Sequence, residues 1–320
     1  MDEDGDTKRS ISARHPPQPI EHGHPRGLEA LMLGEGLALT AAALWSLSVV
    51  LFKRSEAIDP HGLNLFKNTV AIVLLSLTML ALGESFPTDR STGDWLRLVV
   101  SGAVGLGLAD TIFFMALRRL GPGLLAVVEC AYAPTVVLLA VLFLGEQPSA
   151  ALIPGALLVV GGVAVISTER IERPPDLRRG LLLGVVAIGC MACGVTLAKP
   201  ALASGHLVEL TLTRLLAGVA MQLTWIAFDP RLHSALAVFR PQPVWRTLLP
   251  ASFLGSYVAM LCWLGGFKWA DASVAAILNQ TATVFTIALG VLILREPLTR
   301  RRIVGASLAM AGAVTIVVLG

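Results

Sequence analysis

Charged residues are scarce in this 320-residue chain, at 15% of the sequence, while hydrophobic residues make up 55%. A soluble domain carries about 25% charged residues, so the composition excludes a globular soluble domain of this length. The net charge is only +3, and the basic residues lie in short loops instead of forming the clustered basic face that nucleic-acid binding requires. The sequence therefore predicts a protein of the lipid bilayer that binds no nucleic acid.

Signatures of catalysis and of cofactor binding are also missing. The chain has no HExxH, no GxSxG and no P-loop. Its cysteines lie in apolar stretches, and the one CxxC pair, Cys190 and Cys193, has no second pair beside it. We interpret the pair as small packing residues. We therefore predict no enzyme, no cofactor and no metal, with a membrane-embedded enzyme kept as an alternative. Any uphill transport must use an ion gradient, because no ATP motif is present.

Long apolar segments are what the sequence does contain. A membrane-spanning helix needs roughly 20 mainly apolar residues. Such segments recur at residues 31–52, 64–82, 96–117, 123–144, 149–167, 180–199, 208–228, 247–267, 272–294 and 302–319. They exceed the roughly ten-residue strands of a barrel and lack alternating polarity. Because backbone groups in hydrocarbon must be satisfied internally, we predict ten transmembrane helices.

The polar breaks predict the domain organisation. Residues 1–28 are polar and include HPPQPIEHGHP, a composition that cannot bury enough apolar surface to fold. His15, His22 and His24 of this tail could bind metal, but a solvated tail is the preferred interpretation. We expect a disordered tail at 1–28, a first five-helix repeat at 29–168, a linker at 169–179 and a second five-helix repeat at 180–320.

The two halves resemble each other in sequence. GEQPSAALIPGALLVVGGVAVI, from Gly145, aligns with REPLTRRRIVGASLAMAGAVTI, from Arg295. The same register pairs Gly105 with Gly255, Glu146 with Glu296, Gly155 with Gly305 and Gly162 with Gly312, and a slightly shorter offset pairs Lys67 with Arg214. Each half has an odd number of spans, so the halves must insert in opposite orientations. We predict an all-α membrane protein with ten transmembrane helices, arranged as a 5+5 inverted repeat around a central cavity. In such repeats the substrate site lies near the midplane between the halves.

Several motifs, in order and duplicated, resemble the EamA-like family of the drug/metabolite transporter superfamily. They include ALWSLSVVLFK, Lys67 in the second span, ADTIFFMALRRLGPGLLAVVECAYAPTVVLLAVLFLGE, TLTRLLAG and FKWADASVAAILNQTATVFTIALGVLILRE. The resemblance covers roughly residues 33–319. It implies ten spans around a central cavity and the export or import of small metabolites, often amino-acid-like. It does not imply one substrate.

Two acidic residues, Asp110 and Glu129, lie well inside predicted spans. A charge at the bilayer centre costs at least about 2.5–3.5 kcal/mol, so each should face the protein interior. Tyr132 lies three residues after Glu129 and is expected on the same helix face. The repeat aligns Glu129 with Asn279, which should share a face with Thr283. We predict that these two polar faces form the substrate site.

The roles of the buried charges have two interpretations each. Glu129, with Asp110, could bind protons or a cationic substrate group, or either acid could pair with Lys67 or Arg214 to hold helices together. Lys67 and Arg214 lie in the first turns of their spans. They could meet an anionic substrate group, pair with an acid, or extend to the interface.

Aromatic residues and the remaining acids are weaker candidates. Trp45, Tyr257 and Trp263 could line the cavity or serve only in packing. Glu146 and Glu296 precede the fifth and tenth spans, where an acid is favoured by the positive helix N-terminus.

Membrane orientation stays open. The resemblance implies cytoplasmic termini, but eight Lys and Arg residues lie on the N-terminal side and fifteen on the opposite side. The positive-inside rule then places both termini outside.

We predict a multi-pass integral protein of the cell (inner) membrane, acting as a monomer or homodimer. Its function is secondary, non-ATP transport of a small metabolite such as an amino acid or related polar solute by alternating access, with proton coupling left open. A cationic drug/proton antiporter is the alternative.

Overall fold

The computed structural model describes residues 28–144, 150, 152–167, 176–202, 205–270 and 272–318. In this part of the chain every regular element is a helix. Residues 1–27 of the predicted tail, with its three histidines, lie outside the described residues, as do Glu146 and residues 169–175 of the predicted linker. The all-helical fold class predicted from the apolar segments is confirmed.

The helices follow the ten apolar segments closely. The first-half elements are α1 (Leu28–Arg54), α2 (Pro60–Ala81), α3 (Thr92–Gly102), the π-helix η1 (Ala103–Leu108), α4 (Ala109–Leu120), α5 (Pro122–Glu129), α6 (Tyr132–Leu144) and α7 (Leu152–Ser167). The second-half elements are α8 (Leu177–Leu202), α9 (Leu207–Phe228), the 3₁₀-helix η2 (Pro230–Phe239), α10 (Trp245–Ser252), the π-helix η3 (Phe253–Ala259), α11 (Met260–Trp269), α12 (Ala272–Leu294) and α13 (Arg300–Val318).

Seven helical stretches of the described chain are long and apolar enough to cross a membrane. They are Met32–Arg54, Pro60–Ala81, Thr92–Leu120, Pro122–Phe143, Leu177–Leu202, Leu207–Phe228 and Trp245–Trp269. Shorter apolar stretches lie on α7 (Ile153–Gly162) and on α12 (Leu278–Leu294). The protein is therefore an integral, multi-pass membrane protein.

The helix starts are specified locally. Asp59 caps α2 by accepting a hydrogen bond from the His61 amide, with Pro60 in the first turn. Ser91 caps α3 in the same way through the Asp94 amide. Gly121, at φ +77°, ends α4, and Pro122 opens α5 immediately after it.

The fourth apolar segment is not the single helix that the sequence predicted. It breaks at Cys130 and Ala131, between α5 and α6. Pro134 is the physical cause, since a proline inside a helix lacks the N–H that would bond to the carbonyl four residues earlier. The aligned position in the second half is Val284, and α12 runs through it without interruption. Glu129 and Tyr132 therefore lie on either side of a break and not on one helix face.

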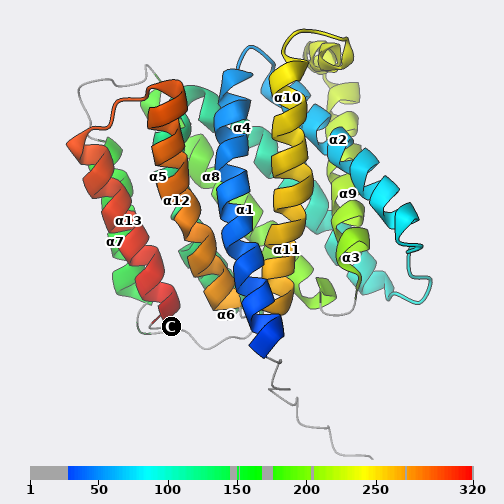
Figure 1. The fold of residues 1–320 in the computed structure, drawn as a ribbon, viewed down its shortest axis with the longest axis horizontal. Helices are drawn as coiled ribbons and strands as arrows, with labels where there is room; N and C mark the ends of the chain where they lie inside the picture. The colour runs from blue at the N-terminus through cyan, green and yellow to red at the C-terminus, as the bar shows by residue number, and fades with distance from the viewer. Residues whose placement is uncertain are drawn as a thin grey trace, which may run out of the picture.

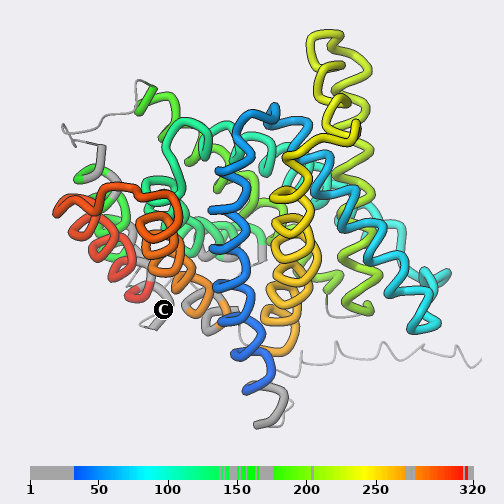
Figure 2. Tube along the Cα trace, turned by 45° about the horizontal axis from the view of Figure 1, so that its top comes forward, coloured from blue at the N-terminus to red at the C-terminus, as the bar shows by residue number. Residues whose placement is uncertain are grey.

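Helix α1 runs through the middle of the bundle. It packs against α11 and α12 on its two sides, as the views of Figures 1 and 2 both show. Helix α8 lies against α4, α5 and α6, and α2 lies against α9. The pair of α7 and α13 forms one flank of the bundle (Figure 1). Most of these contacts join one half of the chain to the other.

Glycines allow α7 and α13 to approach closely. A Cβ at Gly162 would lie 2.5 Å from the carbonyl oxygen of Gly305, and a Cβ at Gly312 would collide with the carbonyl oxygen of Gly155. Small residues at such positions let membrane helices pack backbone to backbone. The two contacts are reciprocal, because the sequence register pairs Gly155 with Gly305 and Gly162 with Gly312.

The start of α1 and the end of α13 lie at the same end of the bundle, which is the lower end in Figure 1. The connection through η2 lies at the opposite end.

Candidate functional site

A cavity of about 160 Å³ lies near the middle of the helices and is lined by both halves of the chain. Eight of the nine predicted site residues line it: Trp45, Asp110, Glu129, Tyr132, Arg214, Trp263, Asn279 and Thr283. A cavity of about 150 Å³ holds benzene in an engineered protein, so this one has room for a molecule of about six to eight non-hydrogen atoms.

Glu129 is the cavity acid without a cationic partner. It ends α5, at the break, and its carboxylate accepts a hydrogen bond from the indole N–H of Trp45 at 3.2 Å. Among the described residues Glu129 forms no ion pair.

Arg214 is a cation that lines the same cavity as Glu129. Its side chain is only 2% exposed, its Nε donates to the Ser101 hydroxyl at 2.9 Å, and its guanidinium lies 5.9 Å from the ring centre of Trp263. Its Nη1 has no hydrogen-bond partner among the described residues, and it forms no ion pair with them. A buried guanidinium with a vacant donor is costly unless a ligand or an anion completes it.

Two further donors at the cavity are also unpaired. The Tyr132 hydroxyl and the Asn279 Nδ2 are buried and have no hydrogen-bond partner within the described chain. Tyr132 comes from α6 and Asn279 from α12, so the two halves each supply one. Together with Arg214, three residues that line the cavity carry a buried donor without a partner in the described chain.

Lys67 does not line the cavity. It is 1% exposed and forms an ion pair with Asp110 at 2.6 Å, directly behind the cavity wall. Of the alternatives for this residue, pairing is therefore observed, and extension to the interface is wrong. Lys67 lies in the third turn of α2, and its side chain is buried among the neighbouring helices.

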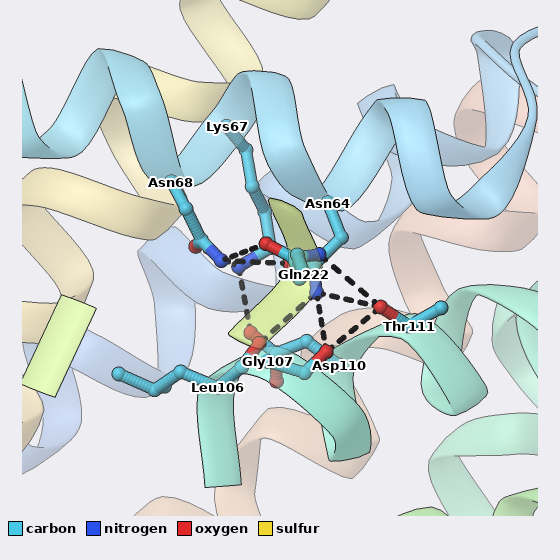
Figure 3. Close-up of polar contacts among 8 residues, drawn as sticks. All are labelled: Asn64, Lys67, Asn68, Leu106, Gly107, Asp110, Thr111 and Gln222. Carbon is cyan, nitrogen blue, oxygen red and sulfur yellow. Dashed lines mark hydrogen bonds and ion pairs between the residues drawn. The ribbon is translucent and has the colours of Figure 1, made fainter. Parts of the chain in front are cut away.

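Figure 3 shows that the Lys67–Asp110 pair belongs to a larger polar cluster. Lys67 also donates to Asn68 at 2.8 Å, and Asn68 donates to Asn64 at 3.0 Å. Asn64 donates to Thr111 and to the carbonyl oxygens of Leu106 and Gly107, while Gln222 donates to Thr111. These partners of Lys67 were not predicted from the sequence. The spacing of Asn64, Lys67 and Asn68, which places them on one face of α2, was a signal for them.

Thr283, from the second half, replaces a backbone hydrogen bond that is lost at the helix break in the first half. Its hydroxyl donates to the Ala126 carbonyl at 3.2 Å and lies 3.3 Å from the Cys130 sulfur. At the break the Cys130 amide bonds to Val127 instead of to Ala126. The Ala126 carbonyl is thus satisfied by α12 of the second half.

Two weaker candidates lie outside the cavity. Tyr257 packs against α2, with its hydroxyl 2.6 Å from the Thr78 hydroxyl. Glu296 precedes α13, but its carboxylate accepts from the Gly123 amide in the first turn of α5 and pairs with Arg302 at 3.3 Å. Burial raises the pKa of Glu296 above its ordinary value of 4.5, although the Arg302 charge and the Gly123 amide oppose the shift. The helix N-terminus that this acid meets is that of α5 and not that of α13.

A buried ion pair at the end of the bundle that contains the start of α1 was also missed. Arg90, before α3, binds Glu209 in the first turn of α9 through two hydrogen bonds of 2.5 and 2.8 Å. Neither side chain is more than 4% exposed. Arg90 lies in a predicted loop and Glu209 at the start of a predicted span, where a sequence gives no reason to expect burial.

Helices apolar enough to cross a membrane surround an internal cavity whose mostly apolar wall includes a few charged and polar side chains, an arrangement typical of a membrane transporter of small solutes. The family is set by comparison with known proteins: the EamA-like transporter family matches residues 32–168 and again residues 178–318. The chain belongs to the EamA-like transporter family, as its motifs led us to expect.

Individual relatives are distant. Protein PecM of Dickeya dadantii (strain 3937) is 25% identical over 230 residues, which cover 71% of this chain and 74% of that protein. The uncharacterized transporter YxxF of Bacillus subtilis (strain 168) is 21% identical over 141 residues, covering 43% and 44%. A solved crystal structure with 20% sequence identity superposes with a TM-score of 0.64, covering 90% of this chain and 96% of that one. This likeness shows a shared fold.

Proposed function

We propose that the protein is a secondary transporter that carries a small zwitterionic solute, such as an amino acid, by alternating access. It acts without ATP and without enzymatic activity, as a monomer or homodimer in the cell (inner) membrane. The observation that carries the proposal is the charge balance of the cavity. Glu129 and Arg214 both border it, and neither has an oppositely charged partner among the described residues.

The unpaired donors support a carboxylate as one end of the solute. Arg214, Tyr132 and Asn279 offer three vacant N–H or O–H groups, and a carboxylate has about four acceptor positions on its two oxygens. Each unpaired buried donor costs about 1–3 kcal/mol, so a ligand that satisfies them recovers this energy. Glu129 is placed to accept the ammonium group.

Ten spans in two inverted repeats are part of the proposal. The family match occurs twice, and α7, α12 and α13 supply three further helices beside the seven stretches already counted. The reciprocal glycine contacts of α7 and α13, and the π-helices η1 and η3 at aligned positions, support a twofold relation between the halves. Odd numbers of spans per half would invert the second half.

A cationic drug/proton antiporter remains a second candidate for one reason. Glu129 accepts a hydrogen bond from Trp45 and forms no ion pair within the described part of the chain, so that it could accept a proton or a cationic drug in turn. The antiporter gives Arg214 no role in binding, so the two proposals predict different ligands.

The test uses three probes that differ by one charged group. L-alanine has both charges, propionate lacks the ammonium group and ethylamine lacks the carboxylate. Binding is measured on the full chain in lipid nanodiscs, and alanine counterflow in proteoliposomes with and without a pH gradient. Alanine should bind at least about tenfold more tightly than either fragment, since each fragment loses a charged hydrogen bond of about 1.5–3 kcal/mol. Ethylamine binding as tight as alanine binding would overturn the amino-acid proposal in favour of the antiporter.

A further inference from the structure

Asp110 is bound by a cation of the first half of the chain and shares the cavity wall with a cation of the second half. Lys67 of α2 binds Asp110 directly at 2.6 Å. Arg214 of α9 lines the same cavity as Asp110, whereas Lys67 is not among the residues that line it. An acid that lines a cavity beside an arginine would normally neutralise that arginine.

The cluster around Lys67 fixes its ammonium group on Asp110. Its Nζ donates to Asp110 and to Asn68, and Asn68 is held in turn by Asn64 and Gln222 (Figure 3). Asn64 is anchored to Thr111, one residue after Asp110 in α4. The acid and its cation therefore keep their geometry through neighbours on both α2 and α4.

The second half lacks this arrangement. Lys67 aligns with Arg214, but the position that aligns with Asp110 is Met260, which also lines the cavity. Among the described residues Arg214 thus forms no ion pair with an acid of the second half, and its Nη1 has no hydrogen-bond partner. Of the two aligned cations, Lys67 is therefore neutralised by an ion pair and Arg214 is not.

We propose that Lys67 is a positioning residue for substrate specificity: by neutralising Asp110, it leaves Arg214 as an uncompensated cation for the carboxylate of the substrate. This inference rests on the proposed function. It assigns a role to a side chain that touches no substrate, and it explains why a buried ion pair lies directly behind the binding cavity.

The test separates charge from packing by comparing substitutions of the pair. K67M leaves Asp110 free to compensate Arg214. K67M/D110N removes both charges of the pair, and K67R keeps the cation. Propionate affinity of the full chain in nanodiscs is the main readout, because propionate carries only the group that Arg214 would bind. Ethylamine affinity and the unfolding temperature are measured on the same samples.

K67M should weaken propionate binding about tenfold, without weakening the binding of ethylamine. K67M/D110N should return propionate affinity to within about threefold of the natural protein, and K67R should resemble the natural protein. A structural role predicts instead that K67M and the double variant lose all ligands together. Equal loss of propionate affinity in K67M and K67M/D110N would overturn the inference.

If K67M does not accumulate as a folded protein, D110N provides the same test from the other side. Loss of the acid beside Arg214 should leave propionate binding at least as tight as in the natural protein. Weaker propionate binding by folded D110N would overturn the inference. Failure of the natural protein to bind alanine would overturn the proposed function and this inference together, whereas alanine binding with a wrong variant pattern overturns this inference alone.

Discussion

Replacement of Glu129 by glutamine tests the substrate site most directly. Glutamine keeps the size of the side chain and an oxygen that can still accept from the Trp45 indole, which lies 3.2 Å away. It removes only the negative charge. If Glu129 binds the ammonium group of the solute, the variant loses one charged hydrogen bond, worth about 1.5–3 kcal/mol.

At about 1.4 kcal/mol per factor of ten, this loss corresponds to alanine binding that is about 10- to 150-fold weaker. Propionate, which has no ammonium group, should bind E129Q about as well as it binds the natural protein. The ratio of the two dissociation constants, measured by titration calorimetry in nanodiscs at one pH, is therefore the decisive quantity.

The matched control is E296Q, the same chemical change at an acid outside the cavity, where alanine affinity should stay within about twofold. An unchanged alanine-to-propionate ratio in folded E129Q would refute the assignment of Glu129 to the ammonium group. A parallel loss of both ligands would show that the residue shapes the cavity without contacting that group.

Three further predictions concern packing, pH and topology. G162L should destabilise the purified protein by about 1–3 kcal/mol, the cost of overpacking, because a Cβ at Gly162 would lie 2.5 Å from the Gly305 carbonyl oxygen. A Cβ at the neighbouring Gly161 would meet nothing within 4 Å, so G161L should leave the unfolding temperature nearly unchanged. Burial raises the folded-state pKa of Glu296 above its ordinary value of 4.5, so the stability that this carboxyl contributes is fully present below pH 4.5 and lost as the pH rises through the folded-state value. E296Q should therefore show a smaller fall in unfolding temperature between pH 4 and pH 7 than the natural protein, and an equal fall would contradict this account. Reporter fusions at the N- and C-termini should report the same side of the membrane, as an even number of spans requires, and opposite sides would exclude ten spans. A cytoplasmic location would agree with the family resemblance, and an external location with the count of Lys and Arg residues.

Much of the fold follows from local properties of the chain. Long apolar runs with few charges specify membrane helices, because a backbone in hydrocarbon has no other partners for its polar groups. The intramembrane acids Asp110 and Glu129 could be assigned to the interior on energetic grounds. The repeat then aligned Glu129 with Asn279, and both line the same cavity.

The break between α5 and α6 was within reach of the sequence but was not predicted. Pro134 removes the hydrogen bond to the Cys130 carbonyl in any helix, yet whether the helix bends or ends also depends on whether the neighbouring backbone groups that lose their bonds find other partners. Thr283, from the other half of the chain, supplies a donor to the freed Ala126 carbonyl. No local pattern identifies a partner 157 residues away.

The charge pairing was the part of the site that the sequence left open. Lys67 and Arg214 occupy aligned positions and look equivalent in sequence, and two acids were available to either of them. The fold brings Asp110 within 2.6 Å of Lys67 and leaves Arg214 and Glu129 without ionic partners among the described residues. Hydropathy and repeat thus specify which residues are buried. Which buried charges neutralise each other depends on helix packing across the two halves, because Coulomb energy depends on distances that sequence spacing between different helices does not contain.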